Sequence, residues 1–181
     1  MLRTYLKSIA EKLHVDGYDA FDENTTRKKP PVLIMPRGIS KHFCSLNYIS
    51  AYSLSGVDVY ATDKINIDIE VLNLWCFFNS SIFWLLREIS GRKNLGGGLL
   101  KSEATDLCSF PVYLPLNLNE EIFAPLFDRD AKDTLSEILS EEHKLIDKII
   151  FDYLAFSEKD RQRCCEYLRT AIEFRNRRSV T

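Results

Sequence analysis

The spacing of apolar residues changes along the chain, and each kind of spacing predicts a different kind of element. Over residues 2–13 apolar positions recur at helical spacing, which predicts an amphipathic helix. Residues 32–69 show short apolar runs and alternation, which predict β-strands. Helical spacing returns over residues 70–90 and again in the last third of the chain. This order predicts a sheet accompanied by helices.

Four stretches in the middle of the chain have the pattern of strands. The apolar run 32–35 is closed by Pro36, which is typical of a buried strand. Residues 43–53 are rich in aromatic and β-branched side chains, while 57–61 and 65–69 alternate between apolar and polar residues. Alternation buries one face of a strand and leaves the other in water. We therefore expect a small, mostly antiparallel sheet.

Two helices, or one kinked helix, are predicted directly after these strands. Residues 70–78 and 81–90 are strongly apolar, and Asn79 or Ser80 can cap the second segment. The run is apolar enough to raise the question of a membrane span, but polar residues interrupt it and it is short for that purpose. We expect these helices to cover the sheet, and no membrane contact.

The last third of the chain predicts a helical hairpin. Residues 131–156 carry an apolar stripe, and Ser157–Asp160 resembles a capping box that starts a helix running to about Arg175. The composition changes after Leu118. The predicted fold class is therefore α+β, with an α+β domain at 1–118 and a helical extension at 119–181.

Composition supports a folded intracellular protein. The chain of 181 residues is 45% apolar and 12% aromatic, as in globular domains. Its five cysteines form no C-x-x-C pair and are odd in number, which favours reduced thiols and argues against zinc. The first helix carries charges throughout and lacks the apolar region of a signal peptide. We expect a cytoplasmic protein without a metal ion.

The net charge of −2 conceals two opposite regions. Residues 27–48 hold five basic residues and no acidic one, whereas residues 119–181 hold 14 acidic and 11 basic residues. A bound phosphate responds to the local field and not to the net charge. The uneven distribution therefore leaves nucleic-acid binding open for the first region.

Two basic segments contain the candidate DNA-binding residues. Arginine and lysine can bind phosphate or guanine edges and asparagine can read adenine, while consecutive glycines bring the main chain close to a ligand. The first segment supplies Arg37, Ser40, Lys41, His42, Asn47 and Tyr48. The second supplies Arg92, Lys93, Asn94, Gly96, Gly97, Gly98 and Lys101. A plain solvated loop, whose glycines only serve a turn, is the alternative for the second segment, and a surface role is the alternative for His42.

A nuclease site is the competing chemical hypothesis. Glu142-His143-Lys144 contains the E-x-K half of a metal-dependent site, but it falls in a strongly helical stretch, and its charges are interpreted as a solvated helix face. His14, His42 and His143 are far apart in the sequence and lack metal-ligand spacing. We therefore expect no catalytic residue in this chain.

The order of several short motifs is similar to a known family. Asn79-Ser80-Ser81 precedes an apolar helix, Glu88–Arg92 ends it, and Leu95–Lys101 and Phe110-Pro111-Val112 follow. This order resembles the C-terminal target-recognition region of adenine-N6 DNA methyltransferases from type II and type IIG restriction–modification systems. Type I specificity subunits show a weaker likeness. Residues 2–14, 31–40 and 151–161 also resemble parts of this region.

The resemblance implies a recognition domain without its catalytic domain. In such proteins a separate domain binds S-adenosylmethionine and receives the adenine in an Asn-Pro-Pro-aromatic segment. Here Lys29-Pro30-Pro31 has the prolines without the asparagine. We therefore expect no methyltransferase activity from this chain alone, with double-stranded DNA and a methyltransferase catalytic domain or subunit as partners. The alternative is a protein-interaction module that docks through its helical hairpin.

Overall fold

The structure is a computed structural model in which part of the chain is described. The described residues are 30–48, 56–60, 67–93, 98–112, 130 and 132–177, with side chains of 67–69 excepted. Residues 31–181 form one compact unit and residues 1–30 form another. The helix predicted at 2–13 lies outside the described residues.

The described part of residues 31–181 has an α+β fold, as predicted, with two antiparallel sheets. In the larger sheet β1 (Leu33–Pro36) lies between β3 (Ser45–Leu46) and β4 (Gly56–Val59). The smaller sheet pairs β2 (Gly38–Ile39) with β5 (Leu100–Lys101). The two sheets are therefore joined through the single residue between β1 and β2.

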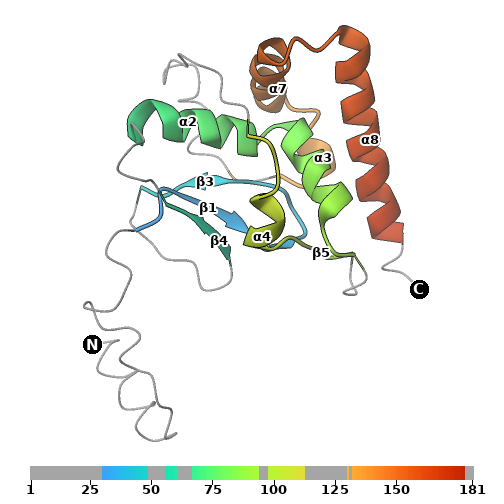
Figure 1. Cartoon of the computed structure of the whole chain (residues 1–181). Helices are drawn as coiled ribbons and strands as arrows, with labels where there is room; N and C mark the ends of the chain where they lie inside the picture. Colours follow the sequence, from blue (N-terminus) through green and yellow to red (C-terminus); the bar gives the residue numbers. More distant parts are fainter. Residues whose placement is uncertain are drawn as a thin grey trace, which may run out of the picture. The chain divides into compact units, whose positions relative to one another are not determined.

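The alternation of β1 follows from its position. Leu33 and Met35 are buried in the core, whereas Ile34 and Pro36 are half-buried on the opposite face. Figure 1 shows helices over one face of the three-stranded sheet. The strand predicted at 32–35 is thus confirmed, within one residue at each end.

Two of the predicted strands differ from the structure. Residues 67–69 of the predicted strand 65–69 belong to helix α2 (Ile67–Phe78). A five-residue alternation is too short to fix a strand, and the apolar run that follows allows helical hydrogen bonding to extend back into it. Within 43–53, the described strand is limited to Ser45–Leu46, and 49–53 lie outside the described residues.

Helix α3 (Ser81–Ser90) begins where the sequence predicts. The Ser80 hydroxyl accepts the N–H of Phe83 and so caps the helix. Asn79 has a different role: its side-chain carbonyl accepts the N–H of Cys44 at 2.9 Å, and its amide donates to the Cys44 carbonyl at 3.0 Å. This side chain therefore fastens the end of α2 to the segment before β3.

The remaining described helices are α4 (Ala104–Leu107), α6 (Thr134–Glu137), α7 (Glu141–Tyr153) and α8 (Glu158–Arg177). The C-terminal helical pair is as predicted, and the Ser157 hydroxyl accepts the N–H of Asp160 at the start of α8. No helix among the described residues is long and apolar enough to cross a membrane.

The terminal helices share one core with the rest of the unit. Helix α8 packs on α3 and α7 packs on α2. Ile146, Ile150, Leu168 and Ile172 of the terminal helices belong to the same buried cluster as Trp84. The domain boundary predicted at 118 falls in 113–129, outside the described residues.

Candidate nucleic-acid interface

The short sheet β2–β5 brings the two basic segments together. Gly38 is the register partner of Lys101, and Ile39 is the partner of Leu100. Arg92 extends the pairing, because its N–H and C=O exchange hydrogen bonds of 2.8 and 3.0 Å with Lys101. We call residues 37–39, 92–93 and 100–101 the basic ribbon.

The ribbon has an apolar side and a charged side. Ile39 and Leu100 are fully buried, so their neighbours along each strand face outward. Arg37 and Arg92 are exposed and Lys101 is half-buried. The charges of all three act on one carboxylate, that of Glu103, so segments that are distant in the sequence place three cations on one small surface.

A carboxylate lies among these cations. Glu103 Oε1 is 2.8 Å from Lys101 Nζ, and its Oε2 is 3.5 Å from Arg37 Nε. The hydrogen bond from Lys101, together with the charges of Arg37 and Arg92, lowers the pKa of Glu103 below its ordinary value. Asp106 lies next to it and accepts the N–H of Glu103. The three cations still exceed these two carboxylates, so the surface is net positive.

Apart from His42 and Gly98, the other predicted residues fall into three groups. Ser40 and Lys41 are exposed and continue directly from β2, and the charge of Lys41 acts on Asp133 before α6. Asn47 and Tyr48 follow β3, which belongs to the other sheet; Asn47 donates to the carbonyl of Pro31, and Tyr48 is 69% exposed. Asn94, Gly96 and Gly97 lie outside the described residues.

His42 is not on the surface, contrary to the sequence-based prediction. It is 1% exposed, stacks on Trp84 and donates from Nε2 to Glu88 Oε1 at 2.8 Å. Burial lowers the pKa of His42, although the hydrogen bond and charge of Glu88 oppose the shift. A neutral, enclosed imidazole is unsuited to binding phosphate in this conformation.

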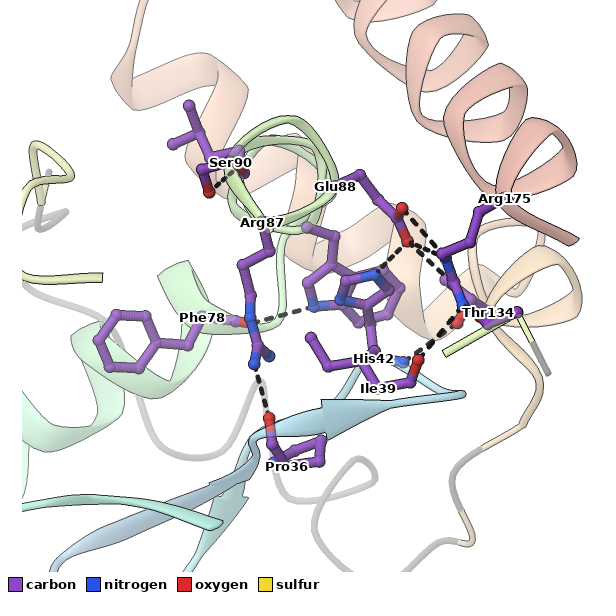
Figure 2. A network of polar contacts seen from close by, with 12 residues as sticks. Pro36, Ile39, His42, Phe78, Arg87, Glu88, Ser90, Thr134 and Arg175 are labelled. Atoms are coloured by element: carbon purple, nitrogen blue, oxygen red, sulfur yellow. Dashed lines mark hydrogen bonds and ion pairs between the residues drawn. The ribbon is translucent and has the colours of Figure 1, made fainter. Parts of the chain in front are cut away.

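Behind the ribbon a buried ionic network links four segments (Figure 2). Arg175 of α8 contacts Glu88 of α3, and the same guanidinium donates to the carbonyls of Ile39 and Gly98. Burial alone would raise the pKa of Glu88, but the hydrogen bonds and charges of His42 and Arg175 lower it. The carboxylate is therefore ionised and holds α8 against both strands of the ribbon.

A second buried arginine holds the end of β1, just before β2. Arg87 of α3 donates from Nη2 to the carbonyl of Pro36 at 2.6 Å (Figure 2). Burial lowers the pKa of Arg87 to about 10, which leaves it charged at neutral pH. The main chain is thus held on both sides of Arg37 and Gly38, at Pro36 and at Ile39. This fixed backbone presents the cations in a defined arrangement.

Gly98, two positions before β5, has a positive φ angle. Its φ is 67°, in the left-handed region that favours glycine, and its carbonyl accepts a hydrogen bond from Arg175. The close approach of the main chain that we predicted for the glycines is therefore present at Gly98, but the group it approaches is the protein's own guanidinium.

Ser81, His143 and Asp147 form another buried polar cluster. The Ser81 hydroxyl donates to Asp147 Oδ2 at 2.6 Å and lies 2.9 Å from His143 Nε2, while the Ser81 N–H donates to Asp147 Oδ1 at 2.7 Å. A nucleophilic serine needs a histidine base that is oriented by the carboxylate through its other nitrogen. Here the serine bonds the carboxylate directly, and all three residues are buried. The cluster joins the start of α3 to α7.

Within the described part of the chain, no arrangement of side chains supports the nuclease hypothesis. His143 of α7 is fully buried, and its ring centroid lies 4.4 Å from that of Trp84 in a tilted arrangement. Among the described residues no group of three or more His, Cys, Asp or Glu side chains could hold a metal ion.

The internal polar networks were missed at the sequence level. Glu88, Asp147 and Arg175 each have one apolar and one polar or charged sequence neighbour, so the local pattern gives no signal of their burial.

Comparisons with protein-family models, with curated proteins and with solved structures gave no match. The function is therefore inferred from the residues of the chain itself.

Proposed function

We propose that the chain is a DNA-binding module whose basic ribbon lies against the phosphates of a duplex. The observation that carries the proposal is the pairing of β2 with β5, which collects Arg37, Arg92 and Lys101 on one surface. A two-stranded ribbon fits the major groove, and arginine and lysine bind phosphate oxygens. Ser40 and Lys41 are also exposed and follow β2 directly in the chain.

The order of the sequence motifs between Asn79 and Val112 supplies the biological role in this proposal. We infer that the module serves as the target-recognition domain of an adenine-specific DNA methyltransferase or restriction–modification protein. Methyl transfer would then belong to a partner domain or subunit that binds S-adenosylmethionine. Phosphate contacts from the ribbon would position the duplex, and residues next to the ribbon would read bases.

The binding role is tested by fluorescence anisotropy with a randomised duplex library at several salt concentrations. We expect a plot of log affinity against log salt with a slope of about −3 to −6, since each phosphate contact contributes about −0.9. The double variant Arg37→Ser, Arg92→Ser should weaken binding and make the slope shallower by about 2.

A matched control removes two cations from another exposed surface. Lys144 and Lys148 of α7 are exposed and pair with Glu141 and Asp152. The double variant Lys144→Ser, Lys148→Ser should keep the affinity and the slope of the wild type. Equal loss in both double variants, or no binding by the wild type at low salt, would overturn the proposal.

A protein-interaction module is the second candidate function. Tyr167 of α8 is 61% exposed, and Phe174, seven positions later on the same helix, is 49% exposed. Residues with this spacing share a helix face, and exposed aromatic side chains are common at protein interfaces. If salt-sensitive DNA binding is absent, a role of this face in docking a subunit becomes the better explanation.

A further inference from the structure

An open groove of about 520 Å³ lies between the larger sheet and the basic ribbon. Its lining includes Ile34 and Pro36 of β1, Phe43 before β3, and Leu99 before β5. Ile34 and Pro36 point away from the core face of the sheet. Gly56 is the register partner of Pro36, and because it carries no side chain, nothing projects into the groove at that position of β4. The volume is within the range of small-molecule sites.

The groove is lined mainly by apolar residues, of which Met35 belongs to the core and the others named above do not. Among the described residues, Ile34, Phe43 and Leu99 stand outside the hydrophobic core that includes the neighbouring Leu33 and Met35. Phe43 is half-buried, and Leu99 is exposed and packs across Gly38. The ring of Phe43 and the side chains of Ile34 and Leu99 can therefore contact a flat apolar group of a ligand.

One rim of the groove is positively charged. Arg37 and Lys101 of the basic ribbon both line it, and Glu103, which pairs with both cations, does not, so the rim keeps a net charge of one positive unit from these three groups. Asp58, on the same sheet face as Ile34, does not line it. A ligand that places a flat ring on the floor and a negative group on this rim would match both properties. A nucleotide has this combination, whereas a base inside an intact duplex is stacked on its neighbours and cannot enter a concave groove.

We propose that the groove takes one unstacked nucleotide of the bound nucleic acid, with its base against Phe43 and its phosphate at Arg37 and Lys101. The inference rests on the proposed DNA-binding function and deepens it by naming the ligand of the adjacent groove. Stacking of a base on an aromatic side chain tolerates any base, because every base has a π-face. The groove therefore adds affinity without fixing the sequence.

The test compares four fluorescein-labelled probes at one low salt concentration: a paired duplex, the same duplex with one bulged nucleotide, the same bulge with an abasic nucleotide, and a single strand. The bulged duplex should bind about tenfold more tightly than the paired duplex, which is the size of one base–aromatic stacking contact. The abasic bulge should lose this gain, because it keeps the phosphate and lacks the base. A single strand that shows the same dependence on Phe43 would also support the site.

Variants of the groove separate stacking from folding. Phe43→Ala should abolish the gain for the bulged duplex and leave the paired duplex unchanged, whereas Phe43→Trp should retain the gain. Ile89→Ala, at an exposed apolar residue of α3, is the matched control and should change neither affinity. Thermal melts followed by circular dichroism show that each variant is folded at the assay temperature.

The outcomes distinguish the two proposals. Salt-sensitive binding of the paired duplex without any gain for the bulge, or a gain that Phe43→Ala leaves intact in the folded protein, would overturn the nucleotide site and leave the DNA-binding function standing. No binding of any probe at low salt would overturn both.

Discussion

The guanidinium of Arg175 contacts both carboxylate oxygens of Glu88, although 87 positions separate the two residues in the chain. Nη2 lies 2.9 Å from Oε1, and the side chains are only 3% and 0% exposed. Arg175 also holds the carbonyls of Ile39 and Gly98. One side chain of the last helix therefore supports both strands of the basic ribbon.

Loss of Arg175 should be strongly destabilising. Arg175→Met leaves the Glu88 carboxylate buried without this partner, which we expect to lower the free energy of unfolding by about 3–5 kcal/mol. Arg177→Met is the matched control, because Arg177 is on the same helix but exposed, 3.8 Å from Glu173. Its effect should be below about 1 kcal/mol. Urea denaturation measures both, and equal losses would show that the buried pair has no special role.

Stability should fall as the pH drops from 7 to 5. Burial holds the pKa of His42 below its ordinary value of 6.5, so the native state keeps the imidazole neutral while the unfolded chain takes up a proton. The free energy of unfolding should then decrease by up to about 1.4 kcal/mol per pH unit below 6.5. Glu88, whose pKa is lowered, adds a second loss below its ordinary value of 4.5, because the unfolded chain takes up a proton there that the folded carboxylate does not.

A variant that cannot titrate isolates the contribution of His42. In His42→Gln the side-chain amide can still donate to Glu88, but the residue takes up no proton. Urea denaturation at several pH values should therefore show a smaller decrease between pH 7 and 5 than in the wild type. An identical decrease in the variant would assign the pH dependence to other groups.

Substitution by alanine should affect stability differently at Gly91, which precedes the ribbon residue Arg92, and at Gly38, which lies within the ribbon. A Cβ at Gly91 would lie 2.6 Å from Leu100 Cδ1 and 2.7 Å from the carbonyl oxygen of Arg87, so the backbone must shift. We expect Gly91→Ala to cost about 1–3 kcal/mol, as in other overpacked sites. A Cβ at Gly38 meets Leu99 at 3.6 Å, an ordinary contact, so Gly38→Ala should be tolerated. Melting temperatures of the two variants test this order.

The cysteines should differ in their reactivity toward iodoacetamide. Burial raises the pKa of Cys44, Cys76 and Cys164 to about 12, so little thiolate forms at pH 8, whereas Cys108 is exposed. Mass spectrometry of the briefly labelled native protein should find the label at Cys108 before these three. Labelling of Cys76 at the rate of Cys108 would show that the core opens readily at α2.

Local patterns predicted the elements whose formation depends on nearby residues. The apolar run of β1 and the cap at Ser80 need only their sequence neighbours to be recognised. The capped start of α8 is of the same kind. These are interactions between residues a few positions apart, which is the range over which periodicity and capping rules apply.

The candidate site could be predicted only as two separate segments. Nothing in the local pattern predicts that Gly38 pairs with Lys101, because a strand of two residues is too short to show an alternation of apolar and polar residues. The burial of His42 depends on Glu88 and Trp84, which lie on a helix much further along the chain. Such partners are selected by tertiary packing, and a single sequence does not contain the pairing information.

The link from Arg175 to the carbonyl of Ile39 spans 136 positions and has a consequence for synthesis on the ribosome. Contacts this distant in sequence form late, because the chain between them must first be ordered. Both basic segments leave the ribosome long before α8 does. The emerging chain therefore cannot complete the support of β2 until α8 has been translated and has left the ribosome, so the ribbon reaches its final geometry well after its own residues have emerged.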